Sequence, residues 1–485
     1  MKRKWWPVAL VLAGLVLVLV VRALRFVPPA EETAVASTAV LDAQAMAGRL
    51  ARAVQFATVS PQPPEPFDPR PFEDFTAWLA GAYPEAHRVL KREIVGGHTL
   101  FFTWQGSDAA ARPALLTGHY DVVPVPPDTR AAWKHPPFAG VIDDGHVWGR
   151  GTLDDKSAVI AIMEAVEHLA RQGHKPRATL HLSFGHDEEL GGEGGAAAVV
   201  KLLESRKVRP AWSLDDGSFV LSGVIPGVAR PVASINLTEK GYVTLVLTAR
   251  GAGGHSSMPP ERTAVGVLAR AVVALEEHPM PGGLDGVGGM TMDALARHMS
   301  FDKRVLFASR WLFGPLIESA LARSPSSNAM IRTTTAPTML SGGAKENVLP
   351  TEATATVNFR LHPRDTPESV QAHVRRVVDD ERVSLAMTRG YGASAVAAID
   401  SAGYRAMQRA VRGAYGDVAT VPGITVGGTD SKHYQAVVDN AYRFNPMMIG
   451  AEDLNGFHGI NERLSVQNLE RAVRFYIELI RSEAR

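Results

Sequence analysis

The 485-residue chain contains no cysteine. This absence excludes a disulfide scaffold, a thiolate zinc site, a cysteine nucleophile and an iron–sulfur cluster. Any metal ion must be held by His, Asp and Glu, and the chain has 16 His and 50 acidic residues. The net charge is also small, because 51 Lys and Arg residues nearly balance the 50 acidic residues and leave a formal charge of +1. A near-neutral chain argues against general nucleic-acid binding, so we expect no nucleic-acid partner.

Charge is missing from an apolar run at residues 5–21, which follows three basic residues at 2–4. Extended to Val27, this run is long enough to span a bilayer, provided that two arginines in the extension reach the interface. We predict a signal anchor or transmembrane helix over 1–27. The positive-inside rule leaves the N-terminus cytoplasmic and the bulk of the chain on the extracytoplasmic side, periplasmic or extracellular. A signal peptide cleaved near Ala34–Val35–Ala36 is the alternative.

Strand and helix patterns alternate along most of the remaining chain, which predicts an α/β fold with a largely parallel sheet. Segments 242–249 and 353–360 instead alternate polar and apolar residues, as in an antiparallel sheet with one exposed face. An irregular, Gly-rich and helical stretch lies at 279–325. The strands and helices predicted for the α/β part are 100–104, 114–116 and 178–184, and 40–59, 157–172, 195–204 and 465–481. The predicted domain parts are a linker at 28–39, an α/β domain at 40–238 and 391–485, and an inserted α+β domain at 239–390.

Five polar motifs follow predicted strands or precede helices: TGHYDVVP (117–124), GRGTLDDK (149–156), SFGHDEELGGEGG (183–195), SLDDGS (213–218) and GFHGINERL (456–464). In an extended segment His119 and Asp121 point the same way, so the carboxylate can orient the imidazole as a metal ligand. Asp154 and Asp155 either cap the following helix, or one of the two is held at the turn as a bridging metal ligand. In the run 187–189, one carboxylate can bind metal while a neighbour stays free as a general base.

Each motif has a structural explanation by itself, such as a buried His–Asp pair, a helix cap or a solvated acidic loop. Five such explanations at five strand ends are less economical than one shared site. The motifs supply His, Asp, Glu, Asp and His. That set suits two zinc ions that share a bridging carboxylate.

In this order, the motifs resemble those of the aminoacylase-1, carboxypeptidase S and succinyl-diaminopimelate desuccinylase family of di-zinc metallopeptidases. The likeness covers about residues 40–485 and is most specific in GHYDVVP, GRGTLDDK and GHDEELGG. The strings WKHPPFAGVIDDGHVWGRGTLDDK (133–156) and INLTEKGYVTL (235–245) are similar to the branch that holds carboxypeptidase S and the N-fatty-acyl-amino acid synthase/hydrolase.

The resemblance implies an α/β, di-zinc aminopeptidase/carboxypeptidase-like catalytic domain with an inserted α+β lid and dimerisation domain. Asp154 would bridge two zinc ions, with cobalt or manganese as alternative metals. Asp121 would orient His119, and Glu188 would be the general base. The fourth motif has Asp where relatives usually have Glu, so two candidates stay open there. The implied metal ligands are His119, Asp154, Glu189, His458 and either Asp216 or Asp215.

The resemblance also implies roles for residues of the insert and of one late loop. His255, in GAGGHSSMP, would polarise the scissile carbonyl, commonly in the site of a partner subunit of a homodimer. From the residues alone it is a surface-turn histidine. Asn347 and Arg360 would hold the substrate carboxylate, although a salt-bridged strand residue is the alternative for Arg360. Gly428 and Thr429, in GGTDS, would supply loop donors.

The implied reaction is hydrolysis of the amide bond of an N-acyl amino acid or of a short peptide with a free C-terminal carboxylate. A carboxypeptidase S-like peptidase is the alternative within enzymes. A non-catalytic binding module on the same scaffold is a third hypothesis, which the complete set of ligands and base opposes. With the N-terminal helix uncleaved, the catalytic domain would be anchored outside the membrane.

Overall fold

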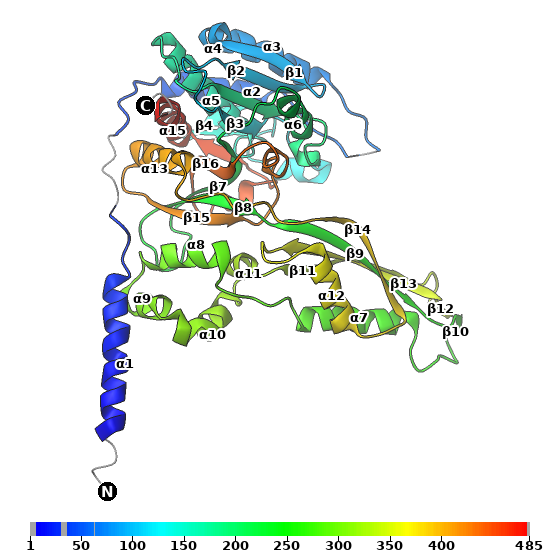
Figure 1. Cartoon of the computed structure of the whole chain (residues 1–485). Helices are drawn as coiled ribbons and strands as arrows, with labels where there is room; N and C mark the ends of the chain where they lie inside the picture. Colours follow the sequence, from blue (N-terminus) through cyan, green and yellow to red (C-terminus); the bar gives the residue numbers. More distant parts are fainter. Residues whose placement is uncertain (1–5, 31–35, 63, 483–485) are drawn as a thin grey trace. The chain divides into compact units, whose positions relative to one another are not determined.

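The computed structural model describes residues 6–30, 36–62 and 64–482 (Figure 1). The predicted basic cluster at 2–4, the start of the apolar run, and most of the alternative cleavage motif Ala34–Val35–Ala36 lie outside the described residues.

The chain forms two compact units, which we call the α/β unit and the insert unit. The α/β unit comprises residues 28–237, 396–423 and 429–482, and the insert unit comprises residues 6–27, 238–395 and 424–428. The segment predicted as an insertion, 239–390, lies within the insert unit. The N-terminal apolar helix belongs to the same unit.

The α/β unit is built on a sheet whose eight strands run in the order β1-β2-β6-β3-β7-β16-β8-β15. The central strands β6, β3, β7 and β16 are parallel, whereas β1, β2 and β8 pair antiparallel with their neighbours. The strands are β1 (Leu90–Val95), β2 (Thr99–Trp104), β3 (Ala114–His119), β6 (Leu180–Gly185), β7 (Trp212–Leu221), β8 (Val232–Glu239), β15 (Ala419–Thr425) and β16 (Asn440–Ile449). A small sheet has the order β17 (Arg463–Ser465), β5 (His146–Trp148) and β4 (Val141–Asp143).

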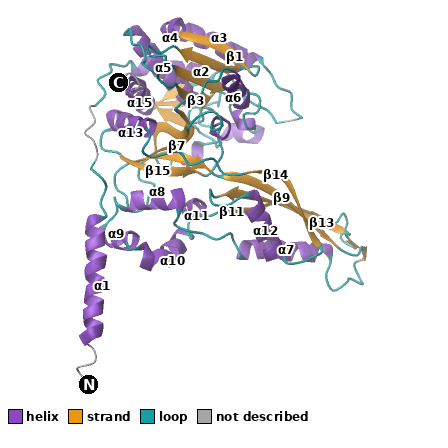
Figure 2. Ribbon diagram, in the orientation of Figure 1, coloured by secondary structure: helices purple, strands orange, loops and turns teal. Residues whose placement is uncertain are grey.

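Helices pack on both faces of this sheet (Figure 2). α5 and α15 pack together against β3 and β16, and α6 and α14 pack against β6, β7 and β16. The helices are α2 (Ala43–Val54), α3 (Arg70–Ala82), α4 (Pro84–Val89), α5 (Lys156–Arg171), α6 (Ala196–Ser205), α13 (Ala402–Tyr415), α14 (Ser431–Tyr434) and α15 (Val466–Ser482), with short 3₁₀ turns η2 (Pro127–Ala132), η3 (Glu188–Leu190) and η4 (Leu454–Gly456). This layered arrangement confirms the predicted α/β fold.

Two predicted elements have different bounds in the structure. The strand predicted at 114–116 continues as β3 to His119, so the first candidate ligand ends the strand. The helix predicted at 40–59 is the shorter α2. It begins after Asp42, whose carboxylate accepts a hydrogen bond from the Ala45 N–H at 3.0 Å, and ends at Val54. A capping aspartate fixes where a helix can begin, and apolar spacing alone does not show this boundary.

The insert unit contains an antiparallel sheet in the order β11-β13-β9-β14, covered on one face by helices α7 and α12. Along β9 and β13 buried and less buried residues alternate, as the sequence pattern predicts for this sheet. The elements are β9 (Gly241–Arg250), β10 (Gly254–His255), β11 (Thr334–Gly342), β12 (Val348–Leu349), β13 (Glu352–Leu361), β14 (Val383–Tyr391), α7 (Ala264–Glu277) and α12 (Pro367–Val378). Apolar side chains of β9, β13, α7 and α12 form its core.

The rest of the insert unit is helical. The stretch predicted as irregular and helical at 279–325 contains three helices in succession, followed by a fourth. These are α8 (Gly286–Ala296), α9 (Phe301–Ala308), α10 (Arg310–Leu321) and α11 (Pro325–Ile331). The N-terminal helix α1 (Trp6–Arg25) packs against α9. Among the described residues α1 is the helix long and apolar enough to cross a membrane, and a signal sequence has the same length and composition.

Candidate metal centre

The histidine and acidic motifs of the α/β unit converge where its parallel strands end. β3 ends at His119, and β6 is followed by Glu188 and Glu189 in η3. Asp154 lies in the loop between β5 and α5, and His458 lies between η4 and β17. In open α/β sheets the loops at the carboxyl ends of the strands form the ligand-binding crevice, which explains why distant motifs meet here.

The Asp154 carboxylate lies between two imidazoles. Its Oδ1 is 3.0 Å from Nε2 of His119, and its Oδ2 is 3.0 Å from Nε2 of His458. Oε1 of Glu189 is 3.4 Å from the same His458 nitrogen. Asp154, Glu189 and His458 thus form one group whose potential ligand atoms lie within 4.8 Å of one another, and His119, Asp154 and Asp216 form a second. Both groups share the Asp154 carboxylate, and His119, Glu188 and Glu189 form a third group that does not include it.

The geometry and the donor chemistry fit divalent cations. Two ligand atoms bound to one zinc at about 2 Å lie roughly 3.3 Å apart in a tetrahedral site, which matches the distances around Asp154. Among the described residues, Oδ1 of Asp216 is buried without a hydrogen-bond partner. A buried carboxylate oxygen needs a proton donor or a cation, and a metal ion held with His119 and Asp154 would supply the cation. We call the set His119, Asp121, Asp154, Glu188, Glu189, Asp216 and His458 the carboxyl edge.

The charges of the carboxyl edge favour a cation as well. Hydrogen bonds to Asp154 and then to Glu189 raise the pKa of His458 to about 10, against the opposing effect of partial burial. Burial raises the pKa of Asp216 well above its usual range, and the nearby Asp215 and Glu188 raise it further. The pKa values of an imidazole and of an acid are thus both raised, which indicates excess negative charge around them. A bound cation would neutralise this charge.

The structure distinguishes the two acids of the fourth motif. Both lie within β7, and not after it as the sequence pattern suggested. Asp215 is opposite Arg443 of β16, whereas Ser218 is opposite the next β16 residue, so the two residues between form a bulge. A bulge re-aims a side chain, and here Asp216 joins the group around His119. Asp215 instead accepts a hydrogen bond from the Thr117 hydroxyl.

Asp121 connects two parts of the carboxyl edge. Its Oδ1 is 3.3 Å from Nδ1 of His119, and the same nitrogen is 3.1 Å from the main-chain oxygen of Asp121. Its carboxylate also accepts the main-chain N–H groups of Glu188 and Glu189, each at 3.2 Å. The resemblance implied only that Asp121 orients His119. In the structure Asp121 also fixes, through these two hydrogen bonds, the loop that carries both glutamates.

Glu462 is a site residue that the sequence motifs did not single out. Its fully buried carboxylate accepts a hydrogen bond from Nη1 of Arg150 at 2.6 Å. It also accepts hydrogen bonds from the main-chain N–H groups of Gly151 and Leu153, at 3.0 and 2.8 Å. Nη2 of Arg150 donates in turn to the Gly459 carbonyl at 3.0 Å. This network joins the loop that carries Asp154 to the loop that carries His458. The available signal was an acid four residues after the histidine in GFHGINERL.

The two readings of the Asp154–Asp155 pair are also separated by the structure. Asp155 occupies the N-cap position of α5, but its side chain makes no capping hydrogen bond. Its Oδ1 accepts Nδ2 of Asn445 at 2.9 Å, and burial raises its pKa well above the usual range. The peptide bond between Asp154 and Asp155 is cis. Neither role of a helix cap is seen for this pair, and it is Asp154 that contacts the two histidines.

The insert unit carries the other predicted site residues. His255 is exposed in β10, where it pairs with Val348 of β12 and its Nδ1 is 2.8 Å from the Ser257 hydroxyl. Asn347 is a neighbour, since its carbonyl accepts the Ser256 N–H at 3.2 Å. Arg360 lies on β13 with its guanidinium 4.7 Å from the centre of the Tyr242 ring. Of the late loop, Gly428 belongs to the insert unit, and the buried Thr429 belongs to the α/β unit.

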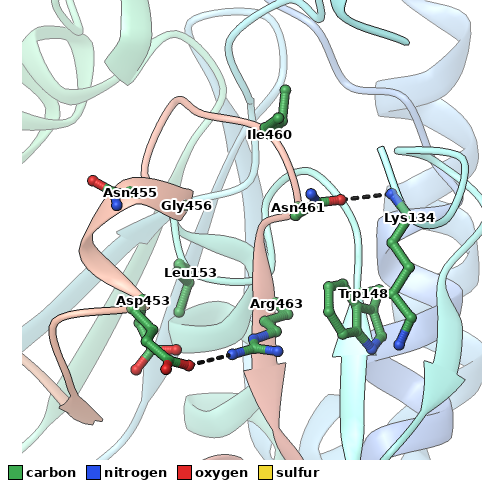
Figure 3. A pocket seen from close by; sticks show the side chains of 10 residues that line it. Lys134, Trp148, Leu153, Asp453, Asn455, Gly456, Ile460, Asn461 and Arg463 are labelled. Carbon is green, nitrogen blue, oxygen red and sulfur yellow. Dashed lines mark hydrogen bonds and ion pairs between the residues drawn. The ribbon is translucent and has the colours of Figure 1, made fainter. Parts of the chain in front are cut away.

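A pocket of about 250 Å³ lies beside the His458 loop of the α/β unit (Figure 3). Two cations of its lining lie over the Trp148 ring. Lys134 Nζ is 4.5 Å from the ring centre, and the Arg463 guanidinium is 5.0 Å from it. Each cation has an acidic partner, Asp143 for the lysine and Glu452 for the arginine. The apolar side chains of Leu153 and Ile460 also line this pocket.

The fold and the clustered histidines and acids define a candidate metal-dependent hydrolase. A model of peptidase family M20/M25/M40 matches residues 115–482. The chain is 42% identical over 413 residues to the N-fatty-acyl-amino acid synthase/hydrolase of Xenopus tropicalis, which covers 84% of this chain and 80% of that protein. It is 39% identical over 482 residues to a probable carboxypeptidase S-like protein of Dictyostelium discoideum, with 97% and 92% covered.

Solved structures share the fold. The M20 family metallo-carboxypeptidase of Sulfolobus solfataricus superposes with a TM-score of 0.63 at 18% identity, over 90% of this chain and 99% of that chain. Human carnosine dipeptidase 1 gives a TM-score of 0.58 at 17% identity, over 91% and 97%. The chain belongs to peptidase family M20/M25/M40, a family of metal-dependent enzymes that hydrolyse amide bonds. This confirms the family that the sequence motifs predicted.

Proposed function

We propose that this enzyme is a di-zinc hydrolase that cleaves the amide bond of N-acyl amino acids. The observation that carries the proposal is the single carboxylate, Asp154, shared by two groups of potential ligands. His119 and Asp216 would complete one zinc site, and Glu189 and His458 would complete the other. When bound, the two ions would lower the pKa of a water molecule and polarise the amide carbonyl.

Glu188 would accept the proton of the attacking water and return it to the leaving amine. Its Oε2 is 3.9 Å from Nε2 of His119, within the carboxyl edge but in neither group that shares Asp154. Burial raises the pKa of Glu188 well above its usual range, and the neighbouring His119 opposes this rise. A carboxyl group that both takes and gives a proton near neutral pH needs a raised pKa. Asp121 would fix the position of His119 relative to the loop that carries Glu188.

The insert unit would act as a lid and dimerisation domain. His255 lies exposed on the β10–β12 pair, close to Asn347, so the same part of the insert unit would bring both residues to a substrate. His255 would steady the tetrahedral oxyanion, in the same subunit or in a partner subunit. Asn347, Arg360, Gly428 and Thr429 would bind the substrate carboxylate. The α1 helix would anchor the enzyme in the membrane, with both units on the extracytoplasmic side.

The relatives support two substrate classes. One is named for N-fatty-acyl-amino acids and another for carboxypeptidase S, at 42% and 39% identity. A membrane anchor places the enzyme near long-chain lipids, which favours the N-acyl amino acids. A carboxypeptidase that acts on short peptides is the second candidate.

A hydrolysis panel tests the substrate class. The zinc-loaded full-length protein in detergent is assayed with N-acetyl, N-lauroyl and N-oleoyl amino acids and with dipeptides, and the Glu188→Gln variant is the matched control. We expect turnover of the N-acyl amino acids that the control lacks. Turnover of dipeptides alone would replace the acylase assignment with the peptidase.

A further inference from the structure

Helix α10 of the insert unit presents an apolar face that no described residue covers. Trp311, Leu312 and Leu316 are 61%, 41% and 59% exposed. With Pro315 and Ser319, which are also exposed, they follow the spacing i, i+1, i+4, i+5 and i+8 and therefore lie on one side of the helix. Glu318 flanks this side, seven residues after Trp311, and its carboxylate is paired with Arg332 at 3.5 Å.

The opposite side of α10 is already occupied by the unit. Ile317, about half a turn away from this face, is buried. α10 packs against α9 and α11. The apolar residues of the other side, Trp311, Leu312 and Leu316, are left exposed, which an amphipathic helix packed only on its own unit would not show.

The helix that precedes α10, α9, packs against α1, the predicted membrane anchor (Figure 1). Nε of Arg22, in the last turn of α1, donates to the Ala308 carbonyl at the end of α9, at 2.7 Å. Nη1 of Arg297 donates to the Val27 carbonyl at 2.9 Å, and its guanidinium lies 4.6 Å from the centre of the Phe26 ring. The chain is therefore tied to α9 where it leaves the apolar run.

The contact also sets the depth of α9 relative to the anchor. The partly or fully buried residues of α1 are Leu15, Leu19, Val20 and Ala23, and α1 packs on α9. From Leu15 to Ala23 the helix rises about 12 Å, against a hydrocarbon core of about 30 Å. A spanning α1 thus places α9, and with it α10, beside the outer half of the bilayer.

We propose that the exposed face of α10 is a lipid-binding surface that inserts into the outer leaflet beside α1. This inference rests on the membrane anchor of the proposed function. Between Arg297 and Arg323 the chain has five Arg or Lys residues against two acids, and the aromatic residues Phe301, Phe307, Trp311 and Phe313. Basic, aromatic and aliphatic residues together are the composition of helices that lie in the membrane interface. The α10 face then fixes the insert unit at the surface from which acylated substrates arrive.

Single-site labelling tests the surface, because the chain has no cysteine to compete with an introduced one. Leu316→Cys is labelled with the fluorophore NBD in the full-length protein, which is reconstituted in phosphatidylcholine vesicles with and without doxyl-labelled lipid. Met339→Cys, on β11 of the same unit and 67% exposed, is the matched control. Leu12→Cys, in α1 and 55% exposed, reports on the anchor.

We expect the label at position 316 to lose roughly half of its fluorescence or more to doxyl lipid and to be shielded from aqueous iodide. The label at position 339 should show the reverse. A label at 316 that iodide quenches as it does at 339 overturns the proposal. Shielding from both quenchers also overturns it, because a second copy of the chain then covers the face. Loss of doxyl quenching at position 12 contradicts the anchor separately, whatever the label at 316 shows.

Discussion

Two buried histidines on neighbouring strands of the α/β sheet behave in opposite ways. His119 ends β3, and burial works against its protonation, but hydrogen bonds to Asp121 and Asp154 outweigh burial and hold its pKa well above its usual range. His181 is the second residue of β6, at the opposite end from the carboxyl edge, and is stacked on Phe101 with ring centres 5.2 Å apart. Burial lowers the pKa of His181 to about 4. Only the histidine at the carboxyl edge can share a cation with acids.

The comparison teaches that burial does not make a histidine a metal ligand. The sheet interior, represented by His181 and Leu182, is a packed apolar layer whose groups stay neutral. The carboxyl edge keeps several acids and imidazoles close together, an arrangement that costs folding energy unless a cation neutralises it. Substitutions at the edge should change metal binding and activity, and substitutions in the interior should change stability.

Asp154→Ala should have the largest effect, because one carboxylate serves both groups. We expect the metal content of the full-length protein to fall from about two ions to about none and activity to be lost. His458→Ala is the control, and it should lose only the ion shared with Glu189. Elemental analysis after gel filtration measures both. One ion retained in the Asp154→Ala protein would show that the carboxylate does not bridge.

Glu188→Gln should abolish most activity without loss of metal. Removal of a general base lowers kcat/KM by about 10²–10⁴-fold. Glu193→Gln, an exposed glutamate of the same loop, should retain normal rates. Steady-state kinetics and metal content are measured on the same samples. A Glu188→Gln enzyme with full activity would remove this residue from the mechanism.

Glu462→Gln should weaken metal binding by about 10–100-fold, as substitutions behind metal ligands typically do. The change leaves the buried Arg150 without its ionic partner and loosens the loops that carry Asp154 and His458. Glu452→Gln, whose side chain is 89% exposed, is the matched control. Competition with a chelator gives the affinity. Unchanged affinity with a lowered melting temperature would assign Glu462 a purely structural role.

Leu182→Ala tests the sheet interior. Leu182 is fully buried in β6, so its truncation should lower the free energy of unfolding by about 2–5 kcal/mol. Metal affinity should stay the same, because no ligand contacts this part of the strand. Ile94→Ala on β1 of the same sheet, at a side chain 50% exposed, should have a much smaller effect. Urea denaturation and chelator competition give the two quantities, and a joint loss would erase the contrast between interior and edge.

His181→Gln should have the smallest effect, and only at low pH. Because the folded-state pKa of about 4 lies below the ordinary value of 6.5, the unfolded chain binds more protons between these pH values. The wild type therefore loses up to about 3 kcal/mol of stability as pH falls from about 7 to about 4, and the variant lacks this loss. Melting temperatures across this range measure it. The exposed His278→Gln should follow the wild type, and parallel curves for all three proteins would contradict the prediction.

The motifs located the segments that carry the candidate ligands, because their chemistry is local. A strand followed by His-x-Asp, or by adjacent acids and glycines, places donors at a strand end whatever the rest of the chain does. Segment 114–116 was nonetheless too short, since β3 continues to His119 through its ladder with β6. The role of Glu462 was not visible either, because its partners Arg150, Gly151 and Leu153 lie in a loop far earlier in the chain.

The amino-acid sequence by itself determined the kind of candidate site, since a chain without cysteine and with these five motifs offers a metal only imidazole and carboxylate ligands. It also determined the family and the α/β pattern. Only the tertiary structure decided that Asp216 and not Asp215 faces His119, because the bulge that turns it arises from pairing of β7 with the distant strand β16. Pairing between segments far apart in the chain depends on the whole fold, which local residue patterns do not specify.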